Sequence, residues 1–414
     1  MKKRYYILAG LVLFAYVAGF RLDFNKDTYV TLYALGSKIN LTNGRGNVNF
    51  TDEYIKNNKG KYRVEIPEVH ELVNIMIAIS EVGQADSNMI NNRSSYHKDV
   101  LEHFLPFATH PVINVINQQI TLGYNDHNSK NKDEIMKSYR FYYAWKMNAC
   151  GYLFDENGSI VDDGIIRRMG SGNPVKKNLK LIEDFVLQTG FRDFYKSNKS
   201  YYDSLLVAYK ELNPINEMKS WLEKQFETQY GSYRITFSPL VGGSHATKRY
   251  SDNGFTQAVM FVSKATYRNG YNRALNELVA SRVVFTEIGH HFVNPISDTY
   301  SSEINKAFGN RSLWVNSSNL GVGGYKTPYK VFNEYMTWAT YSLYAYDNYN
   351  VDDLDIFINK MEFQMENERG FIKFKAFNQK LLSMYKSKSK NKKVFELYSE
   401  LLNWCSEQNN NSEI

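Results

Sequence analysis

Apolar residues recur at helical spacing through most of the first half of the chain. Between residues 68 and 82, for example, Val69, Leu72, Val73 and Met76 follow the three-and-four rhythm of a helix with one buried face. The same rhythm predicts further helices at residues 96–107, 112–120, 132–150 and 178–221, the last with breaks at Gly190 and Pro214. The first half is therefore predicted to be a mostly helical scaffold.

The pattern changes near Gly231, where apolar and polar residues begin to alternate. Residues 233–240 have the period of two that is typical of a strand, and residues 255–262 give a second strand. A helix is predicted at residues 275–292, and Asn294 and Pro295 are expected to end it. Later helices are predicted at residues 330–346, 351–366, 371–385 and 393–405.

Strands are also predicted near the N-terminus. Residues 29–50 alternate around a turn at residues 43–46, and residues 62–66 are expected to extend this hairpin. Together the patterns predict an α+β fold that is mostly helical, with a small β-sheet embedded in a helical scaffold. The expected segments are a leader (1–20), a short β-rich segment (21–66), a single domain (67–405) with a helical half (67–228) and a strand-and-helix half (229–405), and a loose tail (406–414).

The first residues have the pattern of an export signal. Lys2, Lys3 and Arg4 form a basic start, and an apolar stretch follows from Ile7 to Phe20. That stretch is shorter than the roughly 20 residues of a membrane-spanning helix, so cleavage near Ala18 is favoured over a permanent anchor. The mature chain is expected to be soluble outside the cytoplasm, periplasmic or extracellular, with membrane contact only through this segment if it stays uncleaved.

Composition excludes some partners and leaves the cysteines open. The chain has 50 basic and 43 acidic residues, and a net charge of +7 over 414 residues is too dilute for a nucleic-acid-binding surface. The lysine-rich run at residues 386–393 carries no interleaved aromatic residue and is interpreted as a solvated loop. Cys150 and Cys405 are interpreted as separate thiols, although one disulfide is not ruled out by the sequence.

The segment from Thr286 to Pro295 comes closest to a recognisable chemistry. In the zinc-protease pattern H-E-x-x-H, two histidines one helical turn apart hold the metal, and the glutamate takes a proton from the metal-bound water. Glu287 stands at the base position and His290 at the second ligand position, but Thr286 replaces the first histidine. Glu334, on a later predicted helix, is placed to supply a third, carboxylate ligand.

Loss of the first histidine is expected to weaken zinc binding by orders of magnitude. A catalytic zinc needs three protein ligands, and a neutral threonine hydroxyl is a poor replacement for an imidazole. His291 points about 100° away from His290 around the helix and cannot substitute. His245, in the loop after the first predicted strand, is the candidate substitute ligand. Zinc is thus expected only if the site is rescued in this way.

Residues near the first strand are candidates for substrate binding. The predicted edge that ends at Ser238, Pro239 and Leu240, followed by Gly242 and Gly243, would present backbone groups to an extended peptide.

Other interpretations of the motif remain open. Glu287, His290 and His291 would also suit a helix end in which the polar groups are simply satisfied by neighbours. A di-iron site would need a second Glu-x-x-His pair on another helix, and none is present. The glycine-rich stretch at residues 321–327 lacks the order of a phosphate-binding loop, and no Gly-x-Ser-x-Gly elbow exists.

At the motif helix the chain resembles a family of bacterial secreted proteins, domain of unknown function 4932, whose members look like gluzincin-type metallopeptidases. The family pattern is close to His-Glu-Phe-Ser-His-Ser-Phe-Val-Asn-Pro, and its end is matched by Phe292, Val293, Asn294 and Pro295. Glu287, His290 and Glu334 are similar to its base and two of its ligands. The upstream strand is similar to Ser238, Pro239, Leu240, Gly242 and Gly243, and residues 68–80 and 110–112 resemble its N-terminal half. The resemblance covers residues 60–380 and implies a zincin-like core of a small sheet and an active-site helix.

These observations lead to three hypotheses for function. The first is a degenerate metallopeptidase homologue, a pseudoenzyme that binds peptide or protein without zinc and without cleaving it. The second is an active zinc peptidase with a remodelled site, in which Glu287 is the base, His290 and Glu334 are ligands, and His245 or water replaces the missing ligand. The third is a structural envelope protein. The sequence names neither the substrate nor the oligomeric state.

Overall fold

A computed structural model of the chain describes residues 21–25, 29–34, 37–42, 48–120, 132–166 and 172–410. The predicted leader at residues 1–20 and the predicted turn at residues 43–46 lie outside the described residues. None of the described helices is both long enough and apolar enough to cross a membrane. The prediction of a mostly helical α+β fold is confirmed.

A mixed four-stranded sheet forms the middle of the molecule. Its strands are β4 (Tyr62–Glu65), β7 (Ser232–Ser238), β8 (Ala246–Asp252) and β9 (Phe255–Ser263). They lie in the order β4-β7-β9-β8. β4, β7 and β9 are parallel, whereas β8 runs antiparallel to β9 and forms one edge. β7 is fully buried and β8 is mostly half-buried, as expected for an inner strand and an edge strand.

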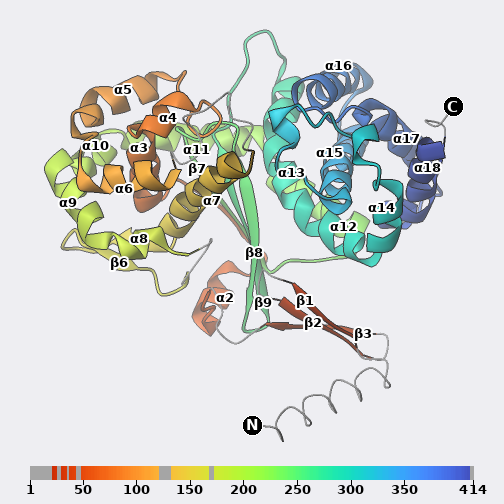
Figure 1. The fold of residues 1–414 in the computed structure, drawn as a ribbon, viewed down its shortest axis with the longest axis horizontal. Coiled ribbons are helices and arrows are strands. Elements are labelled where there is room, and N and C mark those ends of the chain that lie inside the picture. Colours follow the sequence, from red (N-terminus) through yellow and green to blue (C-terminus); the bar gives the residue numbers. More distant parts are fainter. Residues whose placement is uncertain are drawn as a thin grey trace, which may run out of the picture.

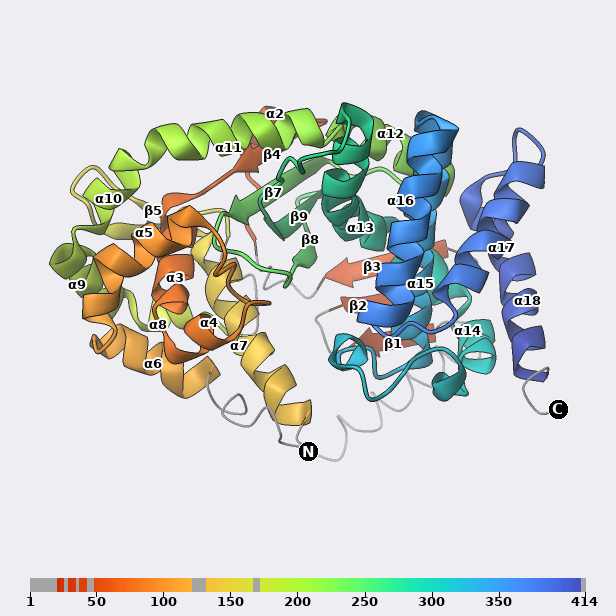
Figure 2. The same ribbon diagram turned by 90° about the horizontal axis from the view of Figure 1, so that it is seen from above.

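Helices cover this sheet in two groups, one on each side of the long strands (Figures 1 and 2). The first group comprises α3 (Glu68–Ala78), α4 (Glu81–Ala85), α5 (Ser95–Phe104), α6 (Pro111–Ile120), α7 (Lys132–Ala149), α8 (Pro174–Lys177), α9 (Leu179–Thr189), α10 (Phe191–Ser197) and α11 (Lys199–Leu212). The second comprises α12 (Ile215–Phe226), α13 (Arg273–Thr299), α14 (Ser301–Ala307), α15 (Pro328–Asn348), α16 (Val351–Phe363), α17 (Phe374–Ser387) and α18 (Tyr398–Asn410). Most predicted helices are therefore confirmed, with the expected breaks after Thr189 and Leu212.

Smaller elements complete the described chain. They are α2 (Asp52–Asn58), the hairpin of β5 (Tyr152–Phe154) and β6 (Ile160–Asp162), a π-helical turn (Gln364–Glu368), and 3-10 turns at Leu105–Phe107, Arg311–Leu313, Leu320–Val322 and Val394–Leu397. α18 continues to Asn410, where Asn409 donates to the carbonyl of Ala307 at 3.1 Å. The prediction of a loose tail from Ser406 is thus wrong for residues 406–410, because this contact and the packing of α18 on α14 hold that turn of helix.

Strands at the N-terminus form a separate antiparallel sheet, β1 (Arg21–Asn25), β2 (Tyr29–Ala34) and β3 (Ser37–Thr42). β2 and β3 pair with each other from Tyr29 and Thr42 to Ala34 and Ser37, so both strands of this pair lie before residues 43–46. β4 does not extend this hairpin but pairs in parallel with β7. That prediction was wrong because a parallel partner far along the chain leaves no local signal in the sequence.

Helix α13 runs through Pro295 instead of ending before it. Proline has no N–H, so the carbonyl of His291, four residues earlier, loses its helical donor. The hydroxyl of Tyr230 donates to that carbonyl oxygen instead. The prediction that Asn294 and Pro295 end the helix was therefore wrong, because a tertiary contact replaces the missing hydrogen bond.

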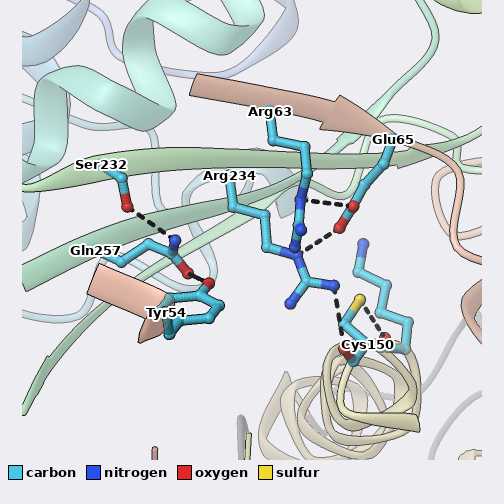
Figure 3. Close-up of polar contacts among 8 residues, drawn as sticks. Tyr54, Arg63, Glu65, Cys150, Ser232, Arg234 and Gln257 are labelled. Carbon is cyan, nitrogen blue, oxygen red and sulfur yellow. Dashed lines mark hydrogen bonds and ion pairs between the residues drawn. The ribbon is translucent and has the colours of Figure 1, made fainter. Parts of the chain in front are cut away.

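Buried polar contacts tie the sheet to α7 (Figure 3). Arg234 on β7 donates to Glu65 on β4, and its Nη2 donates to the carbonyl of Cys150 at 3.1 Å. Nearby, Gln257 accepts from Tyr54 at 3.1 Å and donates to Ser232 at 2.8 Å. Cys150 and Cys405 are both buried and free, in agreement with the interpretation as separate thiols.

A buried acid lies in the core of the first helical group. Glu71 on α3 is fully buried and accepts a 2.8 Å hydrogen bond from Tyr96, which lies 2.6 Å from the hydroxyl of Tyr202. Burial raises the pKa of Glu71 to about 7, and the hydroxyls of Ser238 and Tyr96 offset only part of that effect. The charged form of this carboxyl therefore destabilises the folded protein.

Substitution Glu71→Gln is expected to stabilise the protein at about pH 8 by roughly 2 kcal/mol. The pKa is raised from 4.5 to about 7 on folding, so the cost of the charge is absent below pH 4.5, grows as the pH rises, and is complete above about pH 7. Urea unfolding of the wild-type protein and the variant across this range measures the difference. A difference that does not change with pH would contradict the expectation.

Candidate functional site

Helix α13 carries Glu287 and His290 at partly exposed positions and Thr286 at a buried one. The hydroxyl of Thr286 donates to the carbonyl oxygen of Val283 at 3.0 Å. Threonine commonly makes this bond to the preceding turn of its own helix. The place that the zinc motif reserves for its first histidine thus holds a side chain that is satisfied by the helix backbone.

His290 reaches across to α15. Gly289 allows this approach, because a Cβ at its position would come within 3.1 Å of the Cγ2 of Thr337. Nδ1 of His290 lies 3.3 Å from the Thr337 hydroxyl, and Nε2 lies 3.5 Å from Oε2 of Glu334. The structure therefore brings together His290 and Glu334, as the sequence predicted for two ligands of one metal.

Glu334 is buried and is already held by other protein groups. Its Oε1 accepts from Nη1 of Arg369 at 2.7 Å and from Nε1 of Trp338 at 2.9 Å. Arg369 follows the π-helical turn at Gln364–Glu368, and its Nη2 donates to the hydroxyl of Tyr325 at 3.1 Å. With His290 facing Oε2, protein groups surround both oxygens of this carboxylate.

The charges of these groups depend on one another. Burial acts to raise the pKa of Glu334, but the charge of Arg369 and the hydrogen bond from His290 outweigh it and hold the pKa well below its usual range. Burial acts to lower the pKa of His290, and Glu334 and Glu287 together raise it. For Glu287, burial is the largest influence and raises the pKa to about 7. Glu334 is thus ionised at neutral pH, whereas Glu287 is near its midpoint.

Cationic groups outnumber the ionised carboxylates around the motif. The guanidinium groups of Arg282 and Arg369 lie 4.2 and 4.6 Å from the ring centroid of Trp338. Lys146 on α7 is fully buried, donates to the carbonyl of Ser244 at 2.8 Å, and has a pKa lowered by burial to about 7. The charge of Glu287 opposes that lowering, so the two side chains influence each other.

His245 lies in this cationic region and does not complete a ligand set. Its Nε2 is 3.1 Å from the hydroxyl of Ser263, at the end of β9. Burial, and then the charges of Lys146 and Arg282, lower the pKa of His245 to about 3. The ring is therefore neutral, and its hydrogen-bond partner is Ser263. The structure gives no support to the substitution of this ligand for the missing histidine.

The contacts of Thr286, His290 and Glu334 do not fit a catalytic zinc ion. Three protein ligands are needed, but the hydroxyl of Thr286 is bonded to its own helix and Arg369 already neutralises Glu334. Arg282 and Arg369 would also repel a divalent cation placed beside them. Among the described residues, no three His, Cys, Asp or Glu side chains are arranged to hold a metal ion.

The predicted substrate-binding residues do not lie on a free edge. Ser238, Pro239 and Leu240 are buried, because β7 is paired on both sides. The carbonyl of Leu240 accepts from the N–H of Asn91 at 2.7 Å, and the N–H of Gly242 donates to Met89 at 3.1 Å. Gly242 is half-buried and Gly243 exposed. The prediction of an edge at these residues was wrong, because β7 pairs with β9 on one side and on the other with β4, a parallel strand far earlier in the chain that leaves no local signal.

The free edge next to the motif is β8. Thr247 on this strand lies 2.6 Å from Nε2 of His291 on α13, so the strand and the motif helix are in direct contact. Ala246 and Tyr250 pack on the other face of the strand, in a cluster with Phe50 and Phe261. The edge strand thus runs beside the helix that carries Glu287 and His290 (Figure 2).

Several residues of the site were missed in the sequence. Arg282 lies on the motif helix and Trp338 on the helix of Glu334, but neither is part of the motif. Arg369 lies in a loop, and Lys146 belongs to a helix of the other group. A helical-face analysis of α15 would place Trp338 one turn after Glu334 and so beside it. Arg369 carries no such signal, because only the tertiary fold brings it to Glu334.

Two surface hollows in the described part of the chain lie away from the motif. One of about 460 Å³ is lined by residues of α17, including Gln379 and Ser383. Another, of about 270 Å³, is lined by Tyr346, Tyr385, Asp347 and lysines that include all five of the lysine-rich run. That run is therefore a largely exposed loop, as predicted, although two tyrosines lie against it. Neither hollow shares a residue with the site.

Comparison of the chain with protein-family models, with curated proteins and with solved structures gives no match. The function proposed below therefore rests on the geometry of the site.

Proposed function

We propose that this protein is a metallopeptidase-like protein that binds an extended segment of a peptide or protein and does not cleave it. The proposal rests on the ionisation and the partners of the Glu334 side chain. Its carboxylate is ionised, buried and neutralised by Arg369, with a further hydrogen bond from Trp338. The guanidinium group of Arg369 thus neutralises Glu334 in place of a metal ion. Peptide hydrolysis by a metal-bound water would then lack its Lewis acid.

The edge strand supports a role in binding. β8 is antiparallel to its only neighbour in the sheet, β9, and most of its residues are half-buried rather than covered. An edge strand offers backbone N–H and C=O groups to a peptide that adds a further strand. Because Thr247 contacts His291, a peptide paired with β8 would lie next to the partly exposed side of α13.

An active hydrolase is the second candidate, and one observation favours it. Glu287 is partly exposed and has a pKa of about 7, the value at which a carboxylate acts well as a general base. Such an enzyme would need an electrophilic group other than the zinc that these residues do not fit. A structural envelope protein, the third hypothesis, gives no reason for the ionised Glu334 at a partly open site.

Peptide pools distinguish these candidates. Immobilised wild-type protein is expected to retain peptides from a pool of random nonapeptides, but not from the same pool with alternate backbone N-methylation, which removes the strand-pairing donors. Mass spectrometry reads both retention and cleavage, with and without a chelator. Retained peptides should stay intact. Cleavage that Glu287→Gln abolishes would instead establish the hydrolase, and retention of neither pool would contradict the proposed function.

A further inference from the structure

Arg282 has a cationic head group without an anionic or carbonyl partner among the residues that the structure describes. Its Cζ lies 4.2 Å from the centroid of the Trp338 ring, and the carboxylate of Glu334 acts on it only through its charge, without an ion pair. A guanidinium carries five N–H donors, and none of those of Arg282 belongs to the described atoms that are buried without a partner, so they are open to water or to a ligand. Burial, followed by the charge of Arg369, lowers the pKa of Arg282 to about 10. At neutral pH the group remains charged.

Arg369 lies beside the same indole ring as Arg282, but its guanidinium group has hydrogen-bond partners within the protein. It lies near the same indole ring at 4.6 Å, yet it also binds the carboxylate of Glu334 and the hydroxyl of Tyr325. Glu334 is thereby occupied and leaves no carboxylate for Arg282. The difference between the two arginines identifies Arg282 as the donor that the protein itself does not use.

Arg282 lies within the site rather than on a remote surface. It is one turn before Thr286 on α13, and its charge acts on His245, which directly precedes the edge strand β8. Lys146 and Arg369 act on the same histidine. A ligand that runs along β8 toward His245 therefore approaches a region of positive charge.

We propose that Arg282 binds a carboxylate group of the peptide ligand, so that the site selects ligands with a free C-terminus or an acidic side chain. The inference rests on the proposed function and specifies its ligand. The planar fork of arginine matches a carboxylate with two parallel hydrogen bonds, and the Trp338 ring holds the guanidinium plane for this contact. Charge-assisted bonds of this kind are stronger in a partly desolvated site than at an open surface.

Three random nonapeptide pools test this inference on the full-length protein. The first has free carboxyl groups, the second has all carboxyl groups methyl-esterified, and the third has only its C-terminus blocked as an amide. Wild-type protein is expected to retain the esterified pool on the order of tenfold less than the free pool. The amide pool then identifies the source: full retention indicates an acidic side chain, and poor retention indicates the C-terminal carboxylate.

Arg282→Met should bind the free and esterified pools equally, whereas Arg273→Met, at an exposed position of the same helix, should keep the preference. Arg282→Lys, which keeps the charge and loses the fork, should keep only part of it. Arg282→Gln replaces the methionine variant if thermal melting shows that the latter does not fold. Equal retention of both pools by the wild type, or a preference that survives loss of Arg282, would overturn the inference alone. Retention of no pool would overturn the proposed function as well.

Discussion

Replacement of Arg369 by methionine is expected to lower the free energy of unfolding by roughly 3–5 kcal/mol. The substitution removes the principal counter-charge of Glu334, which has only 4% of its side chain exposed, and leaves an ionised carboxylate beside Trp338 and His290. Methionine keeps much of the apolar stem, so the loss arises mainly from the charge. Urea unfolding at neutral pH measures the change.

A double substitution separates the ion pair from general packing. Glu334→Gln combined with Arg369→Met removes both charges and should be clearly more stable than Arg369→Met alone, because no buried charge remains unpaired. Arg273→Met, at an exposed position, should change stability by about 0.5 kcal/mol or less. If the double variant were as unstable as Arg369→Met, the role assigned to the Glu334 and Arg369 pair would be wrong.

Zinc binding is expected to appear when two substitutions are combined, Thr286→His and Arg369→Met. The first supplies the imidazole that stands one helical turn before His290, and the second frees Glu334 to act as a ligand. The double variant is expected to bind one zinc ion with an affinity on the order of micromolar or tighter. Because zinc binds only the folded state, it should also raise the melting temperature of this variant.

Each single substitution is the control for the pair. Thr286→His alone should bind zinc far more weakly, because Arg369 still neutralises Glu334 and repels the ion. Arg369→Met alone keeps Thr286, whose hydroxyl is bonded to Val283. Isothermal titration of the three variants compares their affinities. Tight binding by Thr286→His alone would show that Arg369 does not block the site.

Local patterns in the sequence predicted most of the helices and three strands of the sheet, β4, β7 and β9. Helix α9 has one apolar face and ends before Gly190, so periodicity locates it, whereas α3 was located by the same rhythm although it is buried on every side from Val69 to Ala78. Strand β8 was missed because its sequence, Ala-Thr-Lys-Arg-Tyr-Ser-Asp, is mostly polar, as suits an edge strand. The parallel pairing of β4 with β7 was also missed, because its partners lie far apart in the chain.

Of the candidate site, the sequence predicted only the residues that belong to the zinc-protease motif. Spacing placed Glu287 and His290 on one helix, and Glu334 was correctly expected to meet His290. The decisive group, Arg369, comes from a loop after a π-helical turn and has no sequence relation to the motif. The prediction of a free edge that ends at Ser238, Pro239 and Leu240 failed for a similar reason, since β7 lies between β9 and the distant strand β4.

The central claim is that Arg369, rather than a metal ion, is the partner of Glu334. The most direct test is the zinc content of the wild-type protein after equilibration with excess zinc and removal of the unbound metal by gel filtration. The geometry of the site predicts far less than one zinc ion per chain. One zinc ion per chain, lost in His290→Ala and in Glu334→Gln, would contradict the claim and restore the interpretation as an active metallopeptidase.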